Sequence, residues 1–548
     1  MNITISGNQY HISFDYNKKV VAAIKKIPGK RWNPQAQIWT VPISEREKVE
    51  KLQSLFQKQN EIKAQPEYVG IIPPMPELQQ EIPLKISPFP YQNTGIAYCL
   101  QKKRCIIGDQ PGLGKTLQAI GVAVATNRKC ILVICPNTLK ENWSNEFKKA
   151  AGWQSIILKD KVKHTWHTFN TVMGIRVFIC NYESLKKYFV EKIVRDIDPQ
   201  TGEQKPLRLN NIHFKATIDR FDMVIIDELH NLKEGATQAS KFAMGISRGK
   251  EYILGLTGTA IVNKPKDLVA QLHIIGRLGD FGGYKYFTDR YCSGKSGASN
   301  LRELNYMLNI NCFYQRLKKD VLKELPDKMR QIIKVEITNR KEYDFALHNL
   351  EAYLAKFKGK TADEIDQSMR GEIMVQIGEL KRISARGKID AAQEYISEVV
   401  GSDEKIGIFV THYDVINELK RAFPDALTIT GKDTLEEREA AKYAFQNDKT
   451  KKEILLSIKA AGVGLTLTAS SRCLFVEMPW HPASAEQCED RFHRIGQKDS
   501  VNCAYLIGEE TIDEWNYDII ERKRDISVQA LGSDDSIQTE IINKLLKL

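Results

Sequence analysis

Short apolar runs alternate with longer amphipathic stretches over residues 91–265. Continuous apolar runs of this length are typical of buried strands, and the stretches between them are typical of crossover helices. Together they indicate a parallel sheet covered by helices. The sequence therefore predicts an α/β domain over 91–265. Its expected strands are 105–107, 130–135, 177–180, 223–226 and 252–256.

A second α/β domain is expected after a long helical stretch. Over 266–400 apolar residues recur at threes and fours, most clearly in 343–357 and 365–383, which predicts a mainly helical insertion. Apolar runs then return, so we assign 401–515 to a second α/β domain and 516–548 to a C-terminal helical brace. The expected strands of the second domain are 406–411, 426–429, 453–458 and 473–477.

The first 63 residues are expected to form a small α+β domain of their own. Apolar residues alternate loosely near the start, as in strands, and 45–56 has the periodicity of a helix. Seven of the 19 prolines lie between 66 and 90, and proline at that density makes a stiff, extended connector. We therefore predict a domain over 1–63 and a proline-rich linker over 64–90 that few contacts cross.

Composition narrows the class of protein and favours one kind of partner. The chain has 548 residues, 42% hydrophobic and 27% charged, which is ordinary for a globular protein and excludes collagen-like, coiled-coil and wholly disordered classes. Lysine and arginine number 80 against 68 acidic residues. The resulting net charge of +12 favours a polyanionic partner without identifying it.

Membrane and metal-cluster functions are not expected. No apolar run approaches the roughly 18 residues of a membrane span, and the first residues lack a signal-peptide pattern. We therefore expect a cytoplasmic protein, associated with the nucleoid if the host is prokaryotic or viral. The ten cysteines include no CxxC pair and have no histidine at zinc-finger spacing, so reduced thiols are expected.

The segment GDQPGLGKT, residues 108–116, follows an expected strand and precedes an expected helix. Gly112 and Gly114 would let backbone amides close around phosphates at the start of that helix. Lys115 would bring a positive charge to the β- and γ-phosphates, and the hydroxyl of Thr116 can ligate magnesium. An ordinary glycine-rich turn is the alternative, and the flanking strand and helix argue against it. The segment predicts binding of ATP and Mg²⁺, although Asp109 replaces the first glycine of the general pattern.

An acidic pair stands just past the expected strand 223–226. Phosphoryl transfer needs a carboxylate for the metal and a group that orients water. We expect Asp227 to hold magnesium, Glu228 to polarise the attacking water, and His230 to communicate with the second lobe. Alone, such a pair is more often a solvated strand end. Here it follows a phosphate loop.

Two arginines far along the chain are candidates for completing the site. Arg491 and Arg494 are three residues apart, which would place them on one face of a helix. Guanidinium groups aimed at a γ-phosphate stabilise the charge of the transition state. Because they lie in the second α/β domain, hydrolysis would depend on closure of the two domains. A surface arginine pair is the alternative.

These three clusters, in this order, resemble helicase superfamily two, and finer matches narrow the resemblance to the Swi/Snf family of DNA-dependent ATPases. The resemblance covers about 85–515 and implies two RecA-like lobes that bind magnesium-ATP between them. Tyr91 and Gln92 match the family's adenine-reading motif. The long insertion resembles the Swi/Snf protrusions, including Arg316 to Val321, whereas RNA helicases of the DEAD type have a short connection there.

Further motifs carry the same resemblance and imply contacts to DNA or nucleotide. In the first lobe, segments starting at Ile134, Asn142, Asn181 and Leu256 match family motifs; in the second lobe, segments starting at Ile408, Thr430, Ala461 and Trp480 do so. The resemblance implies that Gly464 contacts nucleotide. Ala260 and His481 depart from the usual residues, and neither departure removes a catalytic group. The implied DNA contacts in the lobes are Pro136, Asn137, Thr257, Thr411 and Gly462.

The N-terminal segments 24–33 and 39–42 resemble a HARP domain, the module found on annealing helicases. Basic residues gather there beside aromatic ones, which suits a groove where phosphates meet cations and bases stack. Trp32 and Trp39 could equally form the core of a small domain. The expected DNA contacts in this module are Lys25, Lys26, Lys30 and Arg31.

The preferred hypothesis is a monomeric DNA-dependent ATPase that translocates on duplex, forked or junction DNA and rewinds or remodels it. A motor that displaces proteins from DNA, such as an RNA polymerase or a nucleosome, is the alternative. A non-enzymatic DNA scaffold would require loss of Lys115, Glu228 or Arg494, and all three are present. The resemblance identifies no protein partner.

Overall fold

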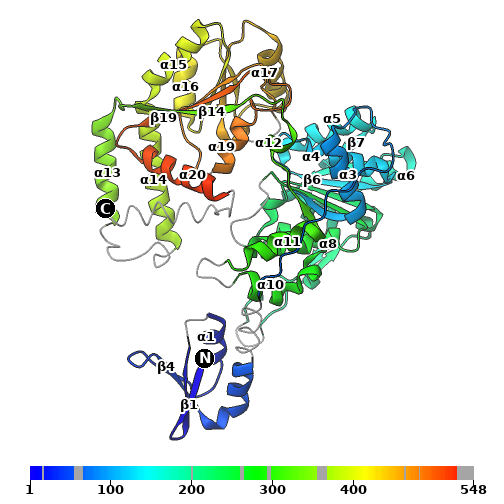
Figure 1. The fold of residues 1–548 in the computed structure, drawn as a ribbon, viewed down its shortest axis with the longest axis vertical. Coiled ribbons are helices and arrows are strands. Elements are labelled where there is room, and N and C mark those ends of the chain that lie inside the picture. Colours follow the sequence, from blue (N-terminus) through cyan, green and yellow to red (C-terminus); the bar gives the residue numbers. More distant parts are fainter. Residues whose placement is uncertain are drawn as a thin grey trace. The chain divides into compact units, whose positions relative to one another are not determined.

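The structure is a computed structural model in which two compact units are distinguished. It describes residues 1–14, 18–54, 66–198, 202–258, 265–292, 298–354, 367–461, 465–480 and 482–527. One unit consists of Met1–Ile72 and Leu278–Met307, and the other of Pro73–Arg277 and Leu308–Leu548. Figure 1 colours the chain from blue at the N-terminus to red at the C-terminus.

The N-terminal part of the first unit is the predicted small α+β domain. Its antiparallel sheet has the order β1-β2-β4-β3, and a helix over 46–54 and helix α1 contribute to its core. Trp39 belongs to that core, whereas the Trp32 ring lies tilted beside it, with the ring centroids 5.2 Å apart, and keeps 47% of its surface exposed. The elements are β1 (Asn2–Ser6), β2 (Gln9–Ser13), α1 (Lys18–Ile24), β3 (Arg31–Asn33) and β4 (Ile38–Pro42).

The proline-rich linker is extended but, contrary to the prediction, it is held by many contacts. In the first unit, Arg290 of α10 (Gly283–Tyr291) donates to the carbonyl of Pro66, and the amide of Tyr68 donates to Glu303 of α11 (Leu301–Asn311). Arg290 and Glu303 also form a buried ion pair.

The linker residues of the second unit are packed in the same way. The Lys85 amide donates to the Ala150 carbonyl at 2.7 Å. The sequence prediction followed the prolines and overlooked the apolar residues between them, which cover the first lobe. These residues are Met75, Leu78, Ile82, Leu84 and Ile86.

The first lobe is built on a seven-stranded parallel sheet of order β13-β5-β12-β11-β6-β8-β7. Its central strands are buried along most of their length, which explains why they are continuous apolar runs. All five strands predicted in this region are present. The sheet consists of β5 (Arg104–Ile107), β6 (Ile131–Cys135), β7 (Ser155–Ile157), β8 (Val177–Asn181), β11 (Met223–Asp227), β12 (Tyr252–Leu256) and β13 (Phe313–Tyr314).

Helices of the first lobe start and end next to these strands. Helix α4 follows β5 after the loop 108–114, and α5 follows β6 after one turn of 3-10 helix. Both helices contribute to the core on one side of the sheet, together with α3. The helices are α3 (Pro90–Lys102), α4 (Lys115–Ala125), α5 (Lys140–Ala151), α8 (Gln238–Ser247) and α9 (Pro265–Ile274).

The second lobe contains a six-stranded parallel sheet of order β14-β19-β18-β15-β17-β16. Helices α15 (Ile389–Gly401) and α16 (Tyr413–Ala422) pack on one side, and α17 (Leu435–Asn447) and α19 (Pro482–Glu489) contribute to the other. The predicted pair of RecA-like lobes is therefore confirmed. The strands are β14 (Lys328–Val335), β15 (Ile406–Val410), β16 (Leu427–Ile429), β17 (Glu453–Ser457), β18 (Arg472–Phe475) and β19 (Val501–Gly508).

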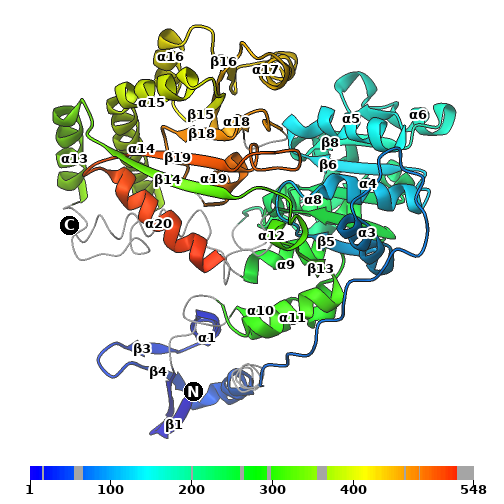
Figure 2. The same ribbon diagram turned by 45° about the horizontal axis from the view of Figure 1, so that its top comes forward.

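The segment predicted as a mainly helical insertion also supplies an edge strand to each sheet. Strand β13 pairs with β5, and β14 pairs with β19 over eight residues (Figure 2). The sequence of β14 is KMRQIIKV, which mixes basic and apolar residues without regular alternation, and Met329 and Ile332 remain about half exposed. Because an edge strand has only one neighbour, it needs no continuous apolar run, so the signal that predicted the central strands is absent here.

The helical part of this segment forms a hairpin that packs on the C-terminal helix. Helices α13 (Arg340–Leu354) and α14 (Gln367–Gly387) share a core with α20 (Ile512–Ser527). The predicted C-terminal brace is thus a helix as far as Ser527, and the remainder of 516–548 lies outside the described residues. Within the described part of the chain, no helix is long and apolar enough to cross a membrane.

Candidate active site at the phosphate loop and the arginine turn

The phosphate loop connects the end of β5 to the start of α4, as predicted. Gly114 is the residue before the helix and has φ = 75°, and Gly112 has φ = 89°. A Cβ atom at Gly114 would clash with the Gln92 side chain, so only glycine fits there. The free amides at the start of α4 and this open backbone form a cradle of the kind that binds phosphate.

Lys115 lies over this loop and donates from Nζ to the carbonyl of Asp109 at 2.6 Å. Burial lowers the pKa of Lys115, and the negative charges of Glu228, Asp109 and Asp227 oppose that effect. A lysine in this position would find a stronger acceptor in a phosphate than in a carbonyl. The loop and Lys115 therefore fit the polyphosphate of a nucleotide.

The acidic pair is placed at the end of β11, where the chain leaves the sheet. Asp227 accepts a hydrogen bond from the indole of Trp143 at 2.8 Å and another from the Glu228 amide at 3.0 Å. The Tyr182 hydroxyl donates to the carbonyl of Asp227. Burial and the charge of Glu228 raise the pKa of Asp227 to about 7. Trp143 and Tyr182 stand in motifs noticed in the sequence, but their role as supports of this carboxylate was missed.

Glu228 has a carboxylate oxygen that is available to accept a hydrogen bond from a ligand or a water molecule. Its backbone is left-handed, with φ = 52°, and its buried Oε2 accepts no hydrogen bond from the described residues. Burial raises its pKa, opposed by the charges of Lys115 and Arg491. A buried carboxylate oxygen without a donor is costly unless a bound group satisfies it.

Thr116 and Asp227 would hold Mg²⁺, which typically binds one or two protein groups and substrate phosphates.

His230 links the acidic pair to the end of β12. Its Nδ1 lies 3.2 Å from the hydroxyl of Thr257 and 3.4 Å from Oε2 of Glu228. Both contacts lie within the first lobe, and the predicted role of His230 toward the second lobe stays a prediction. Thr257 was predicted as a DNA contact, yet it is only 2% exposed.

The two arginines of the second lobe do not lie on a helix, so that prediction is wrong. Helix α19 ends at Glu489, and residues 490–497, here called the arginine turn, form consecutive turns. The buried ring of Phe492 packs against Phe409 and Gly407 of the sheet, which draws the chain out of helical geometry. Tertiary packing has therefore decided the backbone conformation here, against the helix that the three-residue spacing of the arginines predicted.

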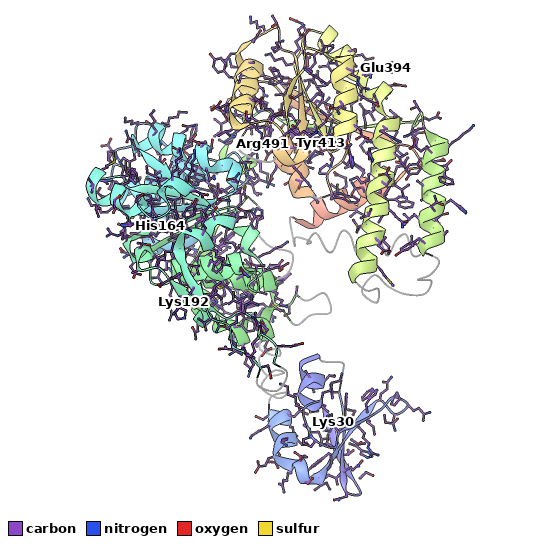
Figure 3. The ribbon with its side chains drawn as sticks, turned by 180° about the vertical axis from the view of Figure 1, so that it is seen from behind. Lys30, His164, Lys192, Glu394, Tyr413 and Arg491 are labelled. Atoms are coloured by element: carbon purple, nitrogen blue, oxygen red, sulfur yellow. The ribbon has the colours of Figure 1, made fainter. Side chains whose placement is uncertain are left out.

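The arginine turn nevertheless directs both guanidinium groups to one place. Arg491 and Arg494 donate to the carbonyl of Leu465 at 3.4 and 3.1 Å, and Arg494 also donates to Thr466 at 3.0 Å. Burial and the neighbouring charge of Arg494 lower the pKa of Arg491 to about 10. Neighbouring guanidinium groups repel each other, and the negative charges of Asp490 and Glu228 oppose this effect on the pKa of Arg491. Figure 3 labels Arg491 in the second lobe.

The phosphate loop, acidic pair and arginine turn meet within the second unit. A Cβ atom at Gly112 would lie 3.6 Å from Cγ of Arg494, and the charges of Glu228 and Arg491 affect each other's pKa. Lys115, Asp227 and the two arginines were all predicted to share one site, and the structure brings them together. Gly462 and Gly464 lie outside the described residues.

Tyr91 and Gln92, at the start of α3, are held against the phosphate loop. The Gln92 amide and the Tyr91 hydroxyl both donate to the carbonyl of Leu113, at 3.1 and 3.3 Å. Gln92 is 2% exposed, and its Oε1 caps the helix by accepting from the Phe89 amide. Both residues are therefore adjacent to the nucleotide cradle.

A buried network around Asp109 was missed by sequence reasoning. Asp109 is fully buried and accepts hydrogen bonds from the amide and guanidinium of Arg316, and from Gln118 at 2.9 Å. Arg316 also donates to the carbonyl of Tyr91. Asp109 itself could have indicated this network, because a buried acidic residue in place of a loop glycine needs a cation beside it. The cation could not be identified from the sequence, because Arg316 is 207 residues away along the chain.

The predicted DNA contacts occupy several parts of the chain. Pro136 and Asn137 directly follow β6, and Thr411 follows β15, where its amide donates to Glu477 at 2.9 Å. Asn137 and Thr411 are exposed. In the N-terminal unit Lys25, Lys26 and Arg31 are exposed and Lys30, labelled in Figure 3, is partly exposed.

Comparison with known protein families decides the classification. The SNF2-related domain matches residues 44–387, more than half of the chain, and the helicase conserved C-terminal domain matches residues 387–496. The chain belongs to the SNF2-related family. It is therefore an SNF2-family ATPase core with helicase-like lobes, and family membership implies the use of ATP. The resemblance of residues 1–63 to a HARP domain stays a prediction.

Two relatives show which kinds of protein the SNF2-family chain is similar to. A Caenorhabditis elegans homolog of SWI/SNF-related matrix-associated actin-dependent regulator of chromatin subfamily A-like protein 1 is 28% identical over 97% of this chain and 76% of that protein. The human DNA annealing helicase and endonuclease ZRANB3 is 30% identical over 83% of this chain but only 42% of its own length.

A solved Sulfolobus solfataricus SWI2/SNF2 ATPase core in complex with dsDNA is 24% identical, with a TM-score of 0.38. The alignment covers 86% of this chain and 98% of that structure.

Proposed function

We propose that this SNF2-family chain is a DNA-dependent ATPase that uses ATP and Mg²⁺ to translocate along duplex DNA and to rewind or remodel forked or branched DNA. The observation that carries the proposal is the meeting of Lys115, Glu228 and Arg494 within one unit. A non-enzymatic scaffold would have no use for a carboxylate beside the phosphate loop whose buried Oε2 accepts no hydrogen bond from the described residues. Hydrolysis divided between two lobes suits a motor that steps as the lobes close.

The carboxyl ends of the parallel strands support a DNA contact. Pro136, Asn137 and Thr411 directly follow buried parallel strands, and open α/β sheets bind their ligands at these strand ends. Backbone amides and small polar side chains at such positions contact phosphates without reading sequence. A motor that tracks along the duplex needs this kind of contact.

The N-terminal unit supports a preference for forks. Lys25, Lys26 and Arg31 are exposed, and the half-exposed ring of Trp32 lies in the same small sheet as Arg31. Cations beside an exposed aromatic ring suit single-stranded nucleic acid, because phosphates and bases are bound together. The name of the human relative, a DNA annealing helicase, is the ground for placing rewinding ahead of protein displacement.

The direct test measures ATP hydrolysis with single-stranded, duplex, forked and RNA effectors at two salt concentrations. We expect strong stimulation by duplex and forked DNA, little by RNA, and weaker stimulation at higher salt because phosphate contacts release counterions. A rewinding assay on a forked substrate accompanies it. Stimulation by RNA alone, or no stimulation by any nucleic acid, would overturn the proposal.

The targeting role of the N-terminal unit is tested by charge removal. Lys30→Ala with Arg31→Ala should lower the salt slope of fork binding by at most about 2, as expected for two lost phosphate contacts, and slow rewinding. Lys48→Ala with Lys51→Ala removes the same charge from the helix of the same unit and is the control. Equal effects of the two pairs would favour the protein-displacing alternative.

A further inference from the structure

The connector between the lobes is bonded to the phosphate loop along its backbone. After β13, the carbonyl of Arg316 accepts from the Gln110 amide at 3.1 Å, and the amide of Lys318 donates to the Gln110 side chain at 2.7 Å. The Arg316 side chain binds Asp109 of the same loop. Residues 316–318 therefore move with the phosphate loop as one body.

The Lys318 side chain extends from this fixed backbone to the arginine turn. Its Nζ donates to the carbonyl of His493 at 2.8 Å and pairs with Asp490 at 2.7 Å. Both side chains are only 8% exposed. On the way, the side chain passes Gly112, where an added Cβ would lie 3.3 Å from Cε of Lys318. A single side chain thus joins the phosphate loop to the turn that carries both arginines.

The attachment points on the turn flank the arginines. Asp490 precedes Arg491 and His493 precedes Arg494, so a bond to each restrains the backbone on which both guanidinium groups are mounted. The turn keeps a few backbone hydrogen bonds, such as that from the Arg491 amide to the Cys488 carbonyl at 3.0 Å, but it has no regular helical ladder, so contacts from outside the turn help to fix its position. Small displacements of groups that act in a transition state are costly, because their effect depends on distance and alignment.

We propose that Lys318 is a positioning residue for ATP hydrolysis, which fixes the arginine turn to the phosphate loop so that Arg491 and Arg494 complete the site. This inference rests on the proposed function, because it assumes that the chain hydrolyses ATP. Lys318 acts through the turn and not on the nucleotide.

The charges around this contact agree with a pair that is formed near neutral pH. Burial would raise the pKa of Asp490, but the positive charges of Lys328 and Lys318 bring it below its ordinary value. Burial lowers the pKa of Lys318 to about 8, against the attraction of Asp490. A buried ion pair of this kind contributes little to stability overall, and without Lys318 the Asp490 carboxylate keeps its longer contact with Lys328, at 3.4 Å.

The first experiment compares Lys318→Met with Lys319→Met, which removes a charge from an exposed position of the same short helix. We expect Lys318→Met to lower kcat by about 10²-fold with KM for ATP changed less than about threefold, since ATP binding does not need the arginine turn. Lys319→Met should match the wild type. A wild-type kcat for Lys318→Met would overturn the inference.

Combining variants separates positioning from a general loss of structure. If Lys318 acts through the turn, Lys318→Met should cause little further loss in a background that carries both Arg491→Ala and Arg494→Ala, whereas independent effects would multiply. Multiplying effects would overturn the inference. Asp490→Asn, which keeps the size of the side chain, should reproduce the kcat effect if Lys318→Met does not fold. A wild-type kcat for Asp490→Asn would overturn it as well.

The outcome is distinguishable from failure of the proposed function. If the wild-type chain shows no nucleic-acid-stimulated hydrolysis, both proposals fail together. If the wild type hydrolyses ATP on DNA and the Lys318 and Asp490 variants do so equally well, only the positioning role fails. Lys318→Arg, which keeps the charge, should recover part of the lost kcat.

Discussion

The two lobes supply their catalytic groups by different structural means. In the first lobe Lys115 begins a helix and Asp227 ends a strand, so regular backbone hydrogen bonds fix both positions. In the second lobe Arg491 and Arg494 stand in a turn held by the Phe492 ring and by side chains from elsewhere in the chain. The first half of the site is preorganised by secondary structure, and the second half depends on tertiary contacts.

This difference indicates which catalytic groups can be moved into or out of position to control hydrolysis. A group fixed by a sheet keeps its position whatever the other lobe does, and can bind nucleotide alone. A turn fixed by contacts such as that of Lys318 can be held or released as the lobes move. Substitutions in the first lobe should therefore change nucleotide binding, whereas substitutions in the second lobe should change hydrolysis without changing nucleotide binding.

The largest effect is expected in the first lobe. Lys115→Ala removes the positive charge of the phosphate loop, so ATP turnover should fall by several orders of magnitude and nucleotide affinity should fall with it. DNA binding without nucleotide should persist. Turnover and binding of a fluorescent ATP analogue are the measurements. Near-normal hydrolysis would show that this loop is not the nucleotide site.

The second lobe should show the opposite division of effects. Arg494→Ala should lower turnover by about 10³-fold while ATP affinity changes little, because an arginine supplied across the cleft acts mainly in the transition state. Arg491→Ala should behave in the same way. A large loss of ATP affinity in either variant would abolish the distinction between the lobes.

The sequence predicted the first lobe better than the second for the same physical reason. Residues 105–107 and 223–226 are buried on both faces of a sheet, so their apolar runs are visible without a structure. The loop between β5 and α4 could then be placed by its neighbours. The chemical role of Arg491 and Arg494 could also be predicted, but their non-helical conformation could not, because the packing of Phe492 decides it.

Contacts between residues distant in sequence were beyond any local pattern. The partners of Asp109 and Asp490, Arg316 and Lys318, lie more than 170 residues away along the chain. Strand β14 was missed because an exposed edge carries no apolar run. The linker was misjudged because prolines are conspicuous and the packed apolar residues between them are not.

A smaller effect should come from the support of Asp227 in the first lobe. Trp143→Phe removes the indole donor to the carboxylate but keeps an aromatic ring in the core, so the apparent affinity for Mg²⁺ should fall by about 10-fold. A magnesium titration of ATPase activity at fixed ATP measures this. Trp153→Phe, a partly buried ring that stacks on Phe147, is the control. An unchanged magnesium midpoint for Trp143→Phe would show that helix α5 does not support the metal site.

The smallest expected effect is a dependence of kcat on pH, which arises from the contact between Lys318 and the arginine turn. Burial lowers the pKa of Lys318 to about 8, so this lysine is charged below that pH and neutral above it, where an ordinary lysine would still be charged. The charged groups around it are Asp490, Lys328 and Arg494, of which only Asp490 favours the protonated form. Raising the pH from 7 to 8 should therefore reduce the protonated fraction, and kcat with it, by about twofold.

Lys318→Arg identifies the group that titrates, because its guanidinium stays charged throughout this range. Normalised to its own value at pH 7, kcat of Lys318→Arg should stay level to pH 9, whereas wild-type kcat should keep falling toward that of Lys318→Met. Single-turnover hydrolysis at saturating ATP and DNA is the measurement, since it removes effects of pH on binding. Parallel profiles for wild type and Lys318→Arg would assign the decline to another group. A level profile for Lys318→Arg alone would show that the catalytic position of the arginine turn depends on a titratable contact made by Lys318.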